Sequence, residues 1–264
     1  MTTILERNNV TFSGAGRDVL MFGHGYGGDQ TIWHAVAPSF EWDYRIVLFD
    51  YVGAGRSDRS AFDPERYKSL RGYALDIIDI CHEFGLEKIN FVGHSVSGMI
   101  GALAAIMEPG LFANLIMIDP SPCYLNQNDY QGGFSRDEVD QLLNLMESDF
   151  KGWSTHMAPI IAANPDKPHV AAEFAACLER NDPRIAQHFA RVTFLSDYRD
   201  DLPRLGTRTL ILQTQEDIMV GVHIGEYIQR TVANSNFVLL DAKGHLPHLS
   251  APELVIQEIE KFLQ

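Results

Sequence analysis

The stretch KINFVGHSVSGMIGALAAI, residues 88–106, decides the fold of this chain. A short apolar run is followed by the turn GHSVS (93–97) and then by a run with helical character. Serine at a sharp strand-to-helix turn is the arrangement of the GxSxG nucleophile motif, in which small flanking residues accommodate a strained backbone. Ser97 stands where the second glycine is usual, and serine is small enough to be a tolerated variant. The pattern predicts that Ser95 is a nucleophile at the carboxyl end of a sheet.

Similar apolar runs recur on both sides of this motif. They show little polar alternation, which is typical of strands buried on both faces. Segments of helical periodicity separate them, and this alternation indicates a mostly parallel sheet with helices on both faces. The predicted strands are 19–23, 45–50, 88–93, 114–119, 208–214 and 236–241. The predicted helices are 71–85, 97–107, 223–232 and 252–263.

One long interval breaks the alternation. About 90 residues separate the strand that ends near Asp119 from the strand that begins near Arg208. Glycine and proline divide this interval into helical patterns, so we interpret it as a helical lid inserted over the sheet. The lid would be residues 121–199, and residues 1–120 and 200–264 would form the core. The predicted lid helices are 135–147, 149–163, 168–180 and 183–195.

A serine hydroxyl is a weak nucleophile and needs a general base. His245 lies in the loop after the last predicted strand, which returns it to the same sheet end as Ser95, and Gly244 lets the chain turn just before it. His248 is the alternative base. Either histidine could instead be an ordinary hydrogen-bonded loop residue.

The base needs a carboxylate that orients it. Asp217 follows the strand 208–214, and the chain order Ser95, Asp217, His245 is one of the known orders of a Ser-His-Asp triad. Asp119 is the alternative acid because it also ends a strand, although it could instead cap the entrance to the lid. Glu216 is adjacent to Asp217 but would point away from it on a turn.

Two glycine-rich loops follow the first two predicted strands. The loop HGYGG (24–28) allows close backbone approach, so the N–H groups of Tyr26 and Val96 are the expected donors to an oxyanion. No GK[ST] follows it, which disfavours a phosphate loop. The loop DYVGAGRS (50–57) lacks the third glycine of a dinucleotide fingerprint, so we interpret it as structural, with Asp50 and Arg56 as a possible pair.

Composition limits the classes of function. The 264 residues carry a formal charge of −14, and the acidic balance disfavours nucleic-acid phosphates and anionic membrane surfaces. No apolar run approaches the length of a membrane span or signal peptide, so we expect a cytoplasmic protein. The cysteines are widely separated, which favours free thiols over a disulfide and gives no zinc pattern. We predict no metal and no organic cofactor. The cysteines are Cys81, Cys123 and Cys177.

Several of these segments together carry a family resemblance. HGYGGDQTIW (24–33), FDYVGAGRSD (49–58), FVGHSVSGMIG (91–101), SPCYLNQNDYQGGF (121–134) and GHLPHLSAPE (244–253) resemble the α/β-hydrolase branch of the bacterial stress regulator RsbQ. They equally resemble its plant relatives, the strigolactone and karrikin receptors. The resemblance spans nearly the whole chain, and the HSVS variant and the GGF before the lid are its most specific parts.

The resemblance implies an α/β-hydrolase core with a mostly parallel sheet and a four-helix lid inserted after the sixth strand. It maps the triad onto Ser95, Asp217 and His245 and the oxyanion donors onto Tyr26 and Val96. Plant receptors often carry phenylalanine at the positions of Tyr26 and Tyr124, so this chain adds two hydroxyl groups there. The implied substrate-binding residues are Tyr26, His94, Tyr124, Phe134, Trp153, Met157 and Phe194.

Two classes of function follow. The first is a serine hydrolase of a small apolar ester or lactone, with an acyl-enzyme cleared by water. The second is a slow-turnover receptor for a small hydrophobic ligand, with a signalling partner that the RsbQ resemblance implies to be a PAS-containing phosphatase. A cofactor-free perhydrolase reaction would use the same triad. Serine at position 95 excludes the aspartate nucleophile of haloalkane dehalogenases.

Overall fold

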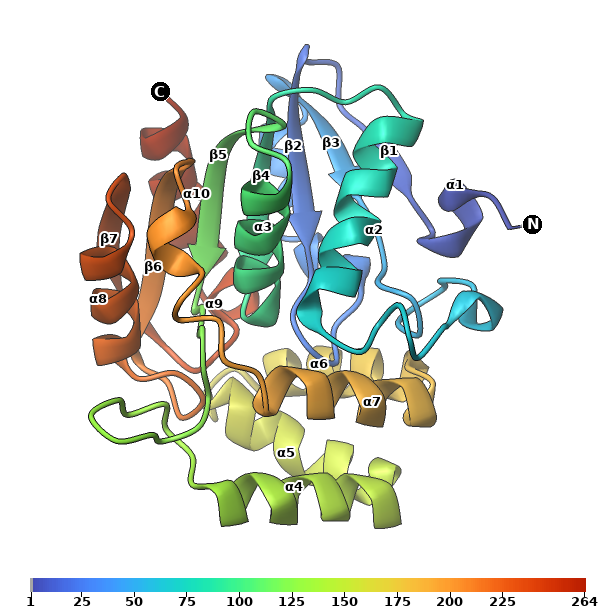
Figure 1. Cartoon of the computed structure of the whole chain (residues 1–264), viewed down its shortest axis with the longest axis vertical. Helices are drawn as coiled ribbons and strands as arrows, with labels where there is room; N and C mark the ends of the chain where they lie inside the picture. The colour runs from blue at the N-terminus through green and yellow to red at the C-terminus, as the bar shows by residue number, and fades with distance from the viewer. Residues whose placement is uncertain (1) are drawn as a thin grey trace.

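The computed structural model describes residues 2–264 and contains one seven-stranded sheet with the order β1-β3-β2-β4-β5-β6-β7 (Figure 1). Strand β1 pairs antiparallel with β3, and every other neighbouring pair is parallel. Parallel pairing brings the carboxyl ends of β2 and β4–β7 to one edge of the sheet. The strands are β1 (Thr11–Ser13), β2 (Asp18–Gly23), β3 (Tyr44–Leu48), β4 (Ile89–His94), β5 (Phe112–Ile118), β6 (Arg208–Glu216) and β7 (Ser235–Lys243).

Alternate residues of the central strands face two separate hydrophobic cores. In β2, Met21 packs into one core and its neighbours Leu20 and Phe22 pack into the other. Helices α2, α3 and α8 cover the first face, and α10 with two short 3₁₀ turns covers the second. Burial on both faces explains the apolar runs without polar alternation. These helices are α2 (Leu70–Glu83), α3 (Val96–Met107), α8 (Val222–Thr231) and α10 (Pro252–Leu263).

Four helices are inserted between β5 and β6: α4 (Arg136–Ser148), α5 (Phe150–Ala162), α6 (Pro168–Arg180) and α7 (Pro183–Phe194). They lie beyond the carboxyl ends of the strands, at the foot of Figure 1. Local sequence fixes their starts: Ser135 forms a capping box with Glu138, and the Asp182 carboxylate accepts two N–H groups at the start of α7. The predicted helices are confirmed to within about one residue at most ends.

One detail of the expected architecture needs correction. The insertion follows the fifth strand of the described chain, not the sixth. The N-terminal residues contribute helix α1 (Ile4–Arg7) rather than a further strand, because Thr3 and Glu6 form a capping box around its first turn. Strand β1 was not predicted, since three residues carry no readable alternation. The short helix α9 (Pro247–Ser250) was also not predicted.

All three cysteines, Cys81, Cys123 and Cys177, are buried free thiols, as favoured from the sequence. Within residues 2–264 the structure contains no helix with the length and apolar character that crossing a bilayer requires.

Candidate active site

Ser95 occupies the turn between β4 and α3. Its backbone has φ 55° and ψ −124°, a conformation with positive φ that non-glycine residues seldom adopt. The Ser95 N–H donates to the carbonyl of Ile118 at 2.7 Å, which ties the turn to β5. Strain of this kind is typical of a turn that exposes a nucleophile above a helix N-terminus.

Tight packing explains the small residues that flank Ser95. A Cβ atom on Gly93 would lie 2.4 Å from the Ser97 carbonyl oxygen, so the turn requires glycine there. Ser97, at the usual position of a glycine, is hydrogen-bonded through Oγ to the carbonyl of His24 and to the Tyr51 hydroxyl. The variant serine therefore joins the turn to the loop after β2.

His245 connects Ser95 to Asp217 through its two ring nitrogens. Nδ1 lies 2.6 Å from Asp217 Oδ2, and Nε2 lies 2.8 Å from Ser95 Oγ. The Asp217 side chain is fully buried, and its other oxygen accepts the Met219 N–H at 2.8 Å. This geometry allows the imidazole to accept the serine proton while the carboxylate holds Nδ1 protonated.

Electrostatics favours the charged form of His245. Burial alone lowers the pKa of the imidazole, but the Asp217 carboxylate, its hydrogen bond and the nearby Asp119 outweigh burial and raise the pKa above its ordinary value. A raised pKa makes the imidazole a stronger base toward the Ser95 hydroxyl.

The end of lid helix α5 holds the backbone on either side of His245. The His245 N–H donates to the Ile161 carbonyl at 3.0 Å. Gly244 has φ 77°, and a Cβ there would lie 1.9 Å from the Ala162 carbonyl oxygen. The chain can pass beneath α5 at this point because residue 244 has no side chain.

The alternative acids are hydrogen-bonded or ion-paired to groups other than His245. Asp119 directs Oδ1 at β6, where it accepts the Thr214 N–H at 2.8 Å and the Gln213 side-chain amide at 2.9 Å. Glu216 is exposed and forms an ion pair with a lysine of β7 at 2.9 Å. Among the three candidate acids, Asp217 is the one in hydrogen-bond contact with His245.

The two expected oxyanion donors border the same turn. Val96 is the first residue of α3, where a helix leaves N–H groups unpaired and carries positive partial charge. Within residues 2–264 neither the Val96 N–H nor the Tyr26 N–H donates a hydrogen bond. A Cβ on Gly25 would lie 2.5 Å from His94 Nδ1 and 3.2 Å from Ser95 Cβ, so glycine lets this loop reach the serine.

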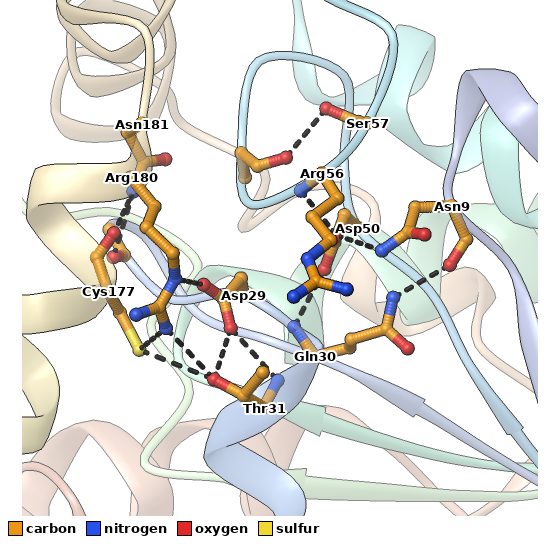
Figure 2. Close-up of polar contacts among 12 residues, drawn as sticks. Asn9, Asp29, Gln30, Thr31, Asp50, Arg56, Ser57, Cys177, Arg180 and Asn181 are labelled. Carbon is orange, nitrogen blue, oxygen red and sulfur yellow. Dashed lines mark hydrogen bonds and ion pairs between the residues drawn. The ribbon is translucent and has the colours of Figure 1, made fainter.

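The corner between α6 and α7 fastens the lid to the loop that carries Tyr26 (Figure 2). Arg180 Nε donates to Asp29 at 2.6 Å, and the Asn181 side-chain amide donates to the Gly27 carbonyl at 3.1 Å. The Asp29 side chain is 2% exposed, so this ion pair is partly shielded from water. A displacement of α6 would therefore be transmitted to the loop.

Figure 2 also shows Asp50 bridging this loop to the second glycine-rich loop. Its carboxylate accepts the Gln30 N–H at 2.8 Å, the Asn9 side-chain amide at 2.7 Å and the Arg56 N–H at 2.9 Å. The expected contact between Asp50 and Arg56 thus forms through the arginine backbone. The loop has the structural role that its sequence suggested.

Ser95 opens into an enclosed apolar cavity beneath the lid. Its volume is about 30 Å³. The Tyr124 hydroxyl lies 3.4 Å from Ser95 Oγ inside it. The lining residues are Tyr26, His94, Ser95, Tyr124, Leu142, Trp153, Met157, Ile161, Phe174, Thr193, Phe194, Met219 and His245.

A second, larger hollow lies against α4 and α5. This outer groove has a volume of about 510 Å³ and shares Leu142, Trp153 and Met157 with the inner cavity. These three side chains form a wall between the two spaces. Movement of the wall would join the space next to Ser95 to the groove.

His94, Asp119 and His245 each offer a potential metal ligand, with the three atoms within 4.8 Å of one another. Both ring nitrogens of His245 already contact Ser95 and Asp217. His94 Nε2 contacts the His245 carbonyl at 2.6 Å. Only His245 has both ring nitrogens engaged, whereas His94 Nδ1 and Asp119 Oδ2 have no partner within residues 2–264, so the cluster leaves at most two uncommitted ligand atoms.

The chain matches the family model described as "alpha/beta hydrolase fold" over residues 18–252. It belongs to the α/β-hydrolase family. The expected fold class is thereby confirmed, and the geometry above lies at the sheet edge where hydrolases of this fold carry their nucleophile.

Named relatives place this α/β-hydrolase in the branch of the strigolactone and karrikin receptors. It is 38% identical to "Karrikin insensitive 2 receptor CA" of Petunia hybrida, over 97% of this chain and 95% of that protein. It is 38% identical to "Strigolactone esterase D14" of Arabidopsis thaliana, over 98% and 97% of the two chains. A hydrolase structure from Oleispira antarctica superposes with a TM-score of 0.96 at 35% identity, covering 99% and 96%.

Most of the predicted binding residues of this α/β-hydrolase line the inner cavity. Phe134 does not line it and packs instead against Phe194, with ring centroids 6.3 Å apart. Sequence reasoning missed part of the lining, since helical periodicity does not tell which apolar face meets the cavity. The missed residues are Leu142, Ile161, Phe174, Thr193 and Met219.

His248, the alternative base, lies behind the site of the α/β-hydrolase. Its ring packs between Trp33 and His94, with centroid distances of 4.8 and 4.4 Å. Neither ring nitrogen has a hydrogen-bond partner within residues 2–264. Burial and then the charge of His245 lower the pKa of His248 to about 3, so it is neutral in the folded protein.

Replacing His248 with phenylalanine should make the protein less sensitive to acid. The unfolded chain protonates this histidine below about pH 6.5 but the folded chain does not, so its share of stability is lost as pH falls from there toward 3. Between pH 6.5 and 4.5 the H248F variant should lose about 2 kcal/mol less stability than the wild type. Urea unfolding midpoints across this range provide the measurement. The exposed His156→Gln serves as control, and equal pH slopes in H248F and wild type would contradict the assignment.

Proposed function

We propose that this protein is a serine hydrolase that cleaves a small apolar ester or lactone. The hydrogen-bonded chain from Asp217 through His245 to Ser95, opening into an apolar cavity, is the observation that carries the proposal. Ser95 Oγ attacks the carbonyl carbon and His245 Nε2 takes the hydroxyl proton. The same imidazole then protonates the leaving alkoxide, and Asp217 stabilises the imidazolium. In the second half of the reaction His245 takes a proton from the attacking water, and it returns a proton to Ser95 Oγ as the acyl group leaves.

The N–H groups of Tyr26 and Val96 donate hydrogen bonds to the oxyanion of the tetrahedral intermediate. Val96 directly follows Ser95 and Tyr26 lines the same cavity, and neither N–H donates a hydrogen bond in the described chain. Donors held in place before reaction stabilise developing charge without reorganising. The mechanism proposed here uses no metal and no organic cofactor.

The cavity suggests the class of substrate. Its walls are mostly aliphatic and aromatic, with the hydroxyls of Tyr26 and Tyr124 as the added polar groups. Burial raises the pKa of Tyr124 to about 12, so its hydroxyl is a neutral donor. A compact ester or lactone carbonyl next to Ser95, with an apolar body against the lid, suits this lining. Strigolactone esterase among the relatives supports a butenolide-type lactone.

A second candidate is a ligand receptor with slow turnover on the same triad. Receptors are named among its relatives, and the inner cavity is too small for a drug-sized ligand unless the lid moves. In this candidate, ligand binding moves the lid and so creates a surface for a signalling protein. The RsbQ resemblance would make that protein a PAS-containing phosphatase.

Intact mass spectrometry after incubation with p-nitrophenyl acetate and a synthetic butenolide tests the proposal. A hydrolase should show a transient mass increase of one acyl group on Ser95 together with many turnovers. A receptor should retain the modification with about one turnover. Absence of both modification and product with either probe would contradict hydrolysis.

Trp153→Ala should shift selectivity toward longer acyl chains. The indole belongs to the wall between the inner cavity and the outer groove, and its removal would join the two spaces. We expect the kcat/KM ratio of octanoate to acetate esters to rise about tenfold, which corresponds to 1.4 kcal/mol. Loss of a buried tryptophan should also cost about 3–5 kcal/mol of stability.

The control for this variant is Phe150→Ala. Phe150 stacks on Trp153 with ring centroids 5.8 Å apart but does not line the inner cavity. Phe150→Ala should lower the urea unfolding midpoint without changing the kcat/KM ratio of octanoate to acetate esters. An unchanged acyl profile in Trp153→Ala, alongside a large midpoint loss, would mean that the tryptophan stabilises the lid and does not select the substrate.

A further inference from the structure

The Asp119 carboxyl group lies behind the catalytic histidine, and the proposed reaction does not use it. Its side chain is completely buried at the carboxyl end of β5, one strand from the loop that carries Asp217. Its backbone has φ 47°, in the left-handed region that costs a non-glycine residue energy. Burial of a carboxyl group and a strained backbone both reduce stability, so they point to a role beyond packing.

The two oxygens of Asp119 have different surroundings. Oδ1 accepts three hydrogen bonds from β6: the Thr214 N–H at 2.8 Å, the Gln213 amide at 2.9 Å and the Thr214 hydroxyl at 3.3 Å. Oδ2 has no partner within residues 2–264. A structural link to β6 needs one acceptor oxygen, which an asparagine would also supply. The second oxygen is therefore unexplained by the fold.

The carboxyl group of Asp119 lies next to the catalytic network. A carboxylate oxygen of Asp119 is within 4.8 Å of a ring nitrogen of His245 and of a ring nitrogen of His94. The titratable groups that face Asp119 are Asp217 from the loop after β6, His245 from the loop after β7, His94 at the end of β4 and Tyr124 after β5. His245 is thus flanked by two buried carboxyl groups.

We propose that Asp119 is a second positioning residue for His245, which stabilises the imidazolium beside Asp217 and accepts the Nδ1 hydrogen bond when Asp217 cannot. The proposal rests on the proposed triad. It predicts that the two carboxyl groups are functionally coupled. It also predicts that Asp119 affects the titration of His245, whereas a residue that merely joins β5 to β6 would not.

The charge of Asp119 follows from its neighbours. Burial, and then repulsion from Asp217, raise the pKa of Asp119 to about 8, while the hydrogen bonds from Thr214 oppose this. In the resting site the group is therefore protonated at neutral pH and becomes ionised above about pH 8. The positive charge of a protonated His245 lowers the pKa of Asp119, so the carboxylate is favoured once the imidazolium forms. Ionisation adds negative charge beside His245 and strengthens the base, so kcat/KM should rise through this range. Asp119→Asn should abolish that rise.

A double-mutant cycle provides the first test, with kcat/KM for p-nitrophenyl acetate measured at pH 7 in Asp119→Asn, Asp217→Asn and the double variant. A triad whose one acid is replaced by asparagine loses about 10⁴-fold in kcat. Because Asp119 would replace part of the lost function, we expect Asp217→Asn to lower kcat/KM by only about 10²-fold. Adding Asp119→Asn to the Asp217→Asn variant should lower kcat/KM by about a further 10²-fold. The same Asp119→Asn change in the wild type should lower kcat/KM by less than about tenfold. A ratio of the two Asp119→Asn effects above about tenfold supports the proposal, and a smaller ratio overturns it.

Thr214→Val is the matched structural control. It removes one donor to Asp119 Oδ1 and leaves the carboxyl group in place. It should lower the unfolding midpoint without altering the activity of Asp217→Asn by more than about threefold. If Thr214→Val reproduces the loss seen with Asp119→Asn, Asp119 acts by holding β6 and the proposal is wrong.

The second test needs no turnover. In a Ser95→Ala background, NMR titration of the His245 imidazole should show a lower pKa when Asp119 is changed to asparagine, because one of the groups that raises it is lost. A change smaller than about 0.3 unit overturns the proposal. Failure of the chain to hydrolyse any ester would instead contradict the proposed function, and this titration would then decide the role of Asp119 alone.

Discussion

Ser95→Ala should abolish ester hydrolysis while leaving the protein folded. Alanine removes the atom that lies 2.8 Å from His245 Nε2 but meets the same positive φ as serine, so the turn gains no new strain. Nucleophile and base act as a unit, and loss of either typically costs 10³-fold or more in kcat. The measurement is steady-state hydrolysis of p-nitrophenyl acetate, with intact mass to show that no acyl group is attached.

Ser97→Ala is the control for that change, because it lies on the same turn. Its Oγ contacts the His24 carbonyl and the Tyr51 hydroxyl and does not contact His245. We expect activity within about tenfold of wild type and a loss of about 1 kcal/mol of stability. Hydrolysis by purified Ser95→Ala at more than about a tenth of the wild-type rate would contradict the assignment of the nucleophile.

The same variant helps to separate the enzyme from the receptor. If ligand binding alone moves the lid, Ser95→Ala should still bind a butenolide and shift its own melting temperature. If the lid moves only when the acyl-enzyme forms, Ser95→Ala should bind the butenolide, but its lid should not move and it should not bind the signalling protein. Comparison of partner binding in the wild type and Ser95→Ala, each with ligand, therefore reports which chemical state is the signal.

Much of this arrangement could be predicted from the chain because parallel strands end at one edge of the sheet. Ser95, Asp217 and His245 each follow a predicted strand, and the structure brings their side chains into one hydrogen-bonded network. The order of the strands could not be read from the apolar runs. It is set by pairing between distant segments, such as β2 with β4.

The parts that the sequence did not reveal depend on contacts across elements. Phe174 lines the cavity and Phe189 does not, although both are buried aromatic residues of lid helices. Phe189 packs instead against Tyr51 and Tyr73, with ring centroids 6.0 and 4.2 Å apart, and helical periodicity does not encode such contacts with the core. Asp119 is a similar case, because its carboxylate accepts the N–H of Thr214 on β6, 95 residues away along the chain.

Gly244→Ala should abolish ester hydrolysis without changing any residue of the proposed triad. An added Cβ would lie 1.9 Å from the Ala162 carbonyl oxygen at the end of α5, so the loop or the helix must shift. The loop is otherwise fixed, because the His245 N–H donates to Ile161 and the Asn164 amide donates to the Lys243 carbonyl. A displacement of about 1 Å at His245 can cost 10²-fold in rate, and we expect at least that loss in kcat/KM.

Gly85→Ala isolates the steric effect from the backbone effect. Gly85 also has positive φ, 59°, but a Cβ there meets nothing within 4 Å. Both variants place alanine in a left-handed conformation at a cost of about 1–2 kcal/mol, so both should lower the unfolding midpoint. Loss of activity should be confined to Gly244→Ala, because only there does the side chain collide with the lid next to the catalytic base. Equal activity in the two variants would show that the end of α5 yields to the loop, and that contact with the lid does not position His245.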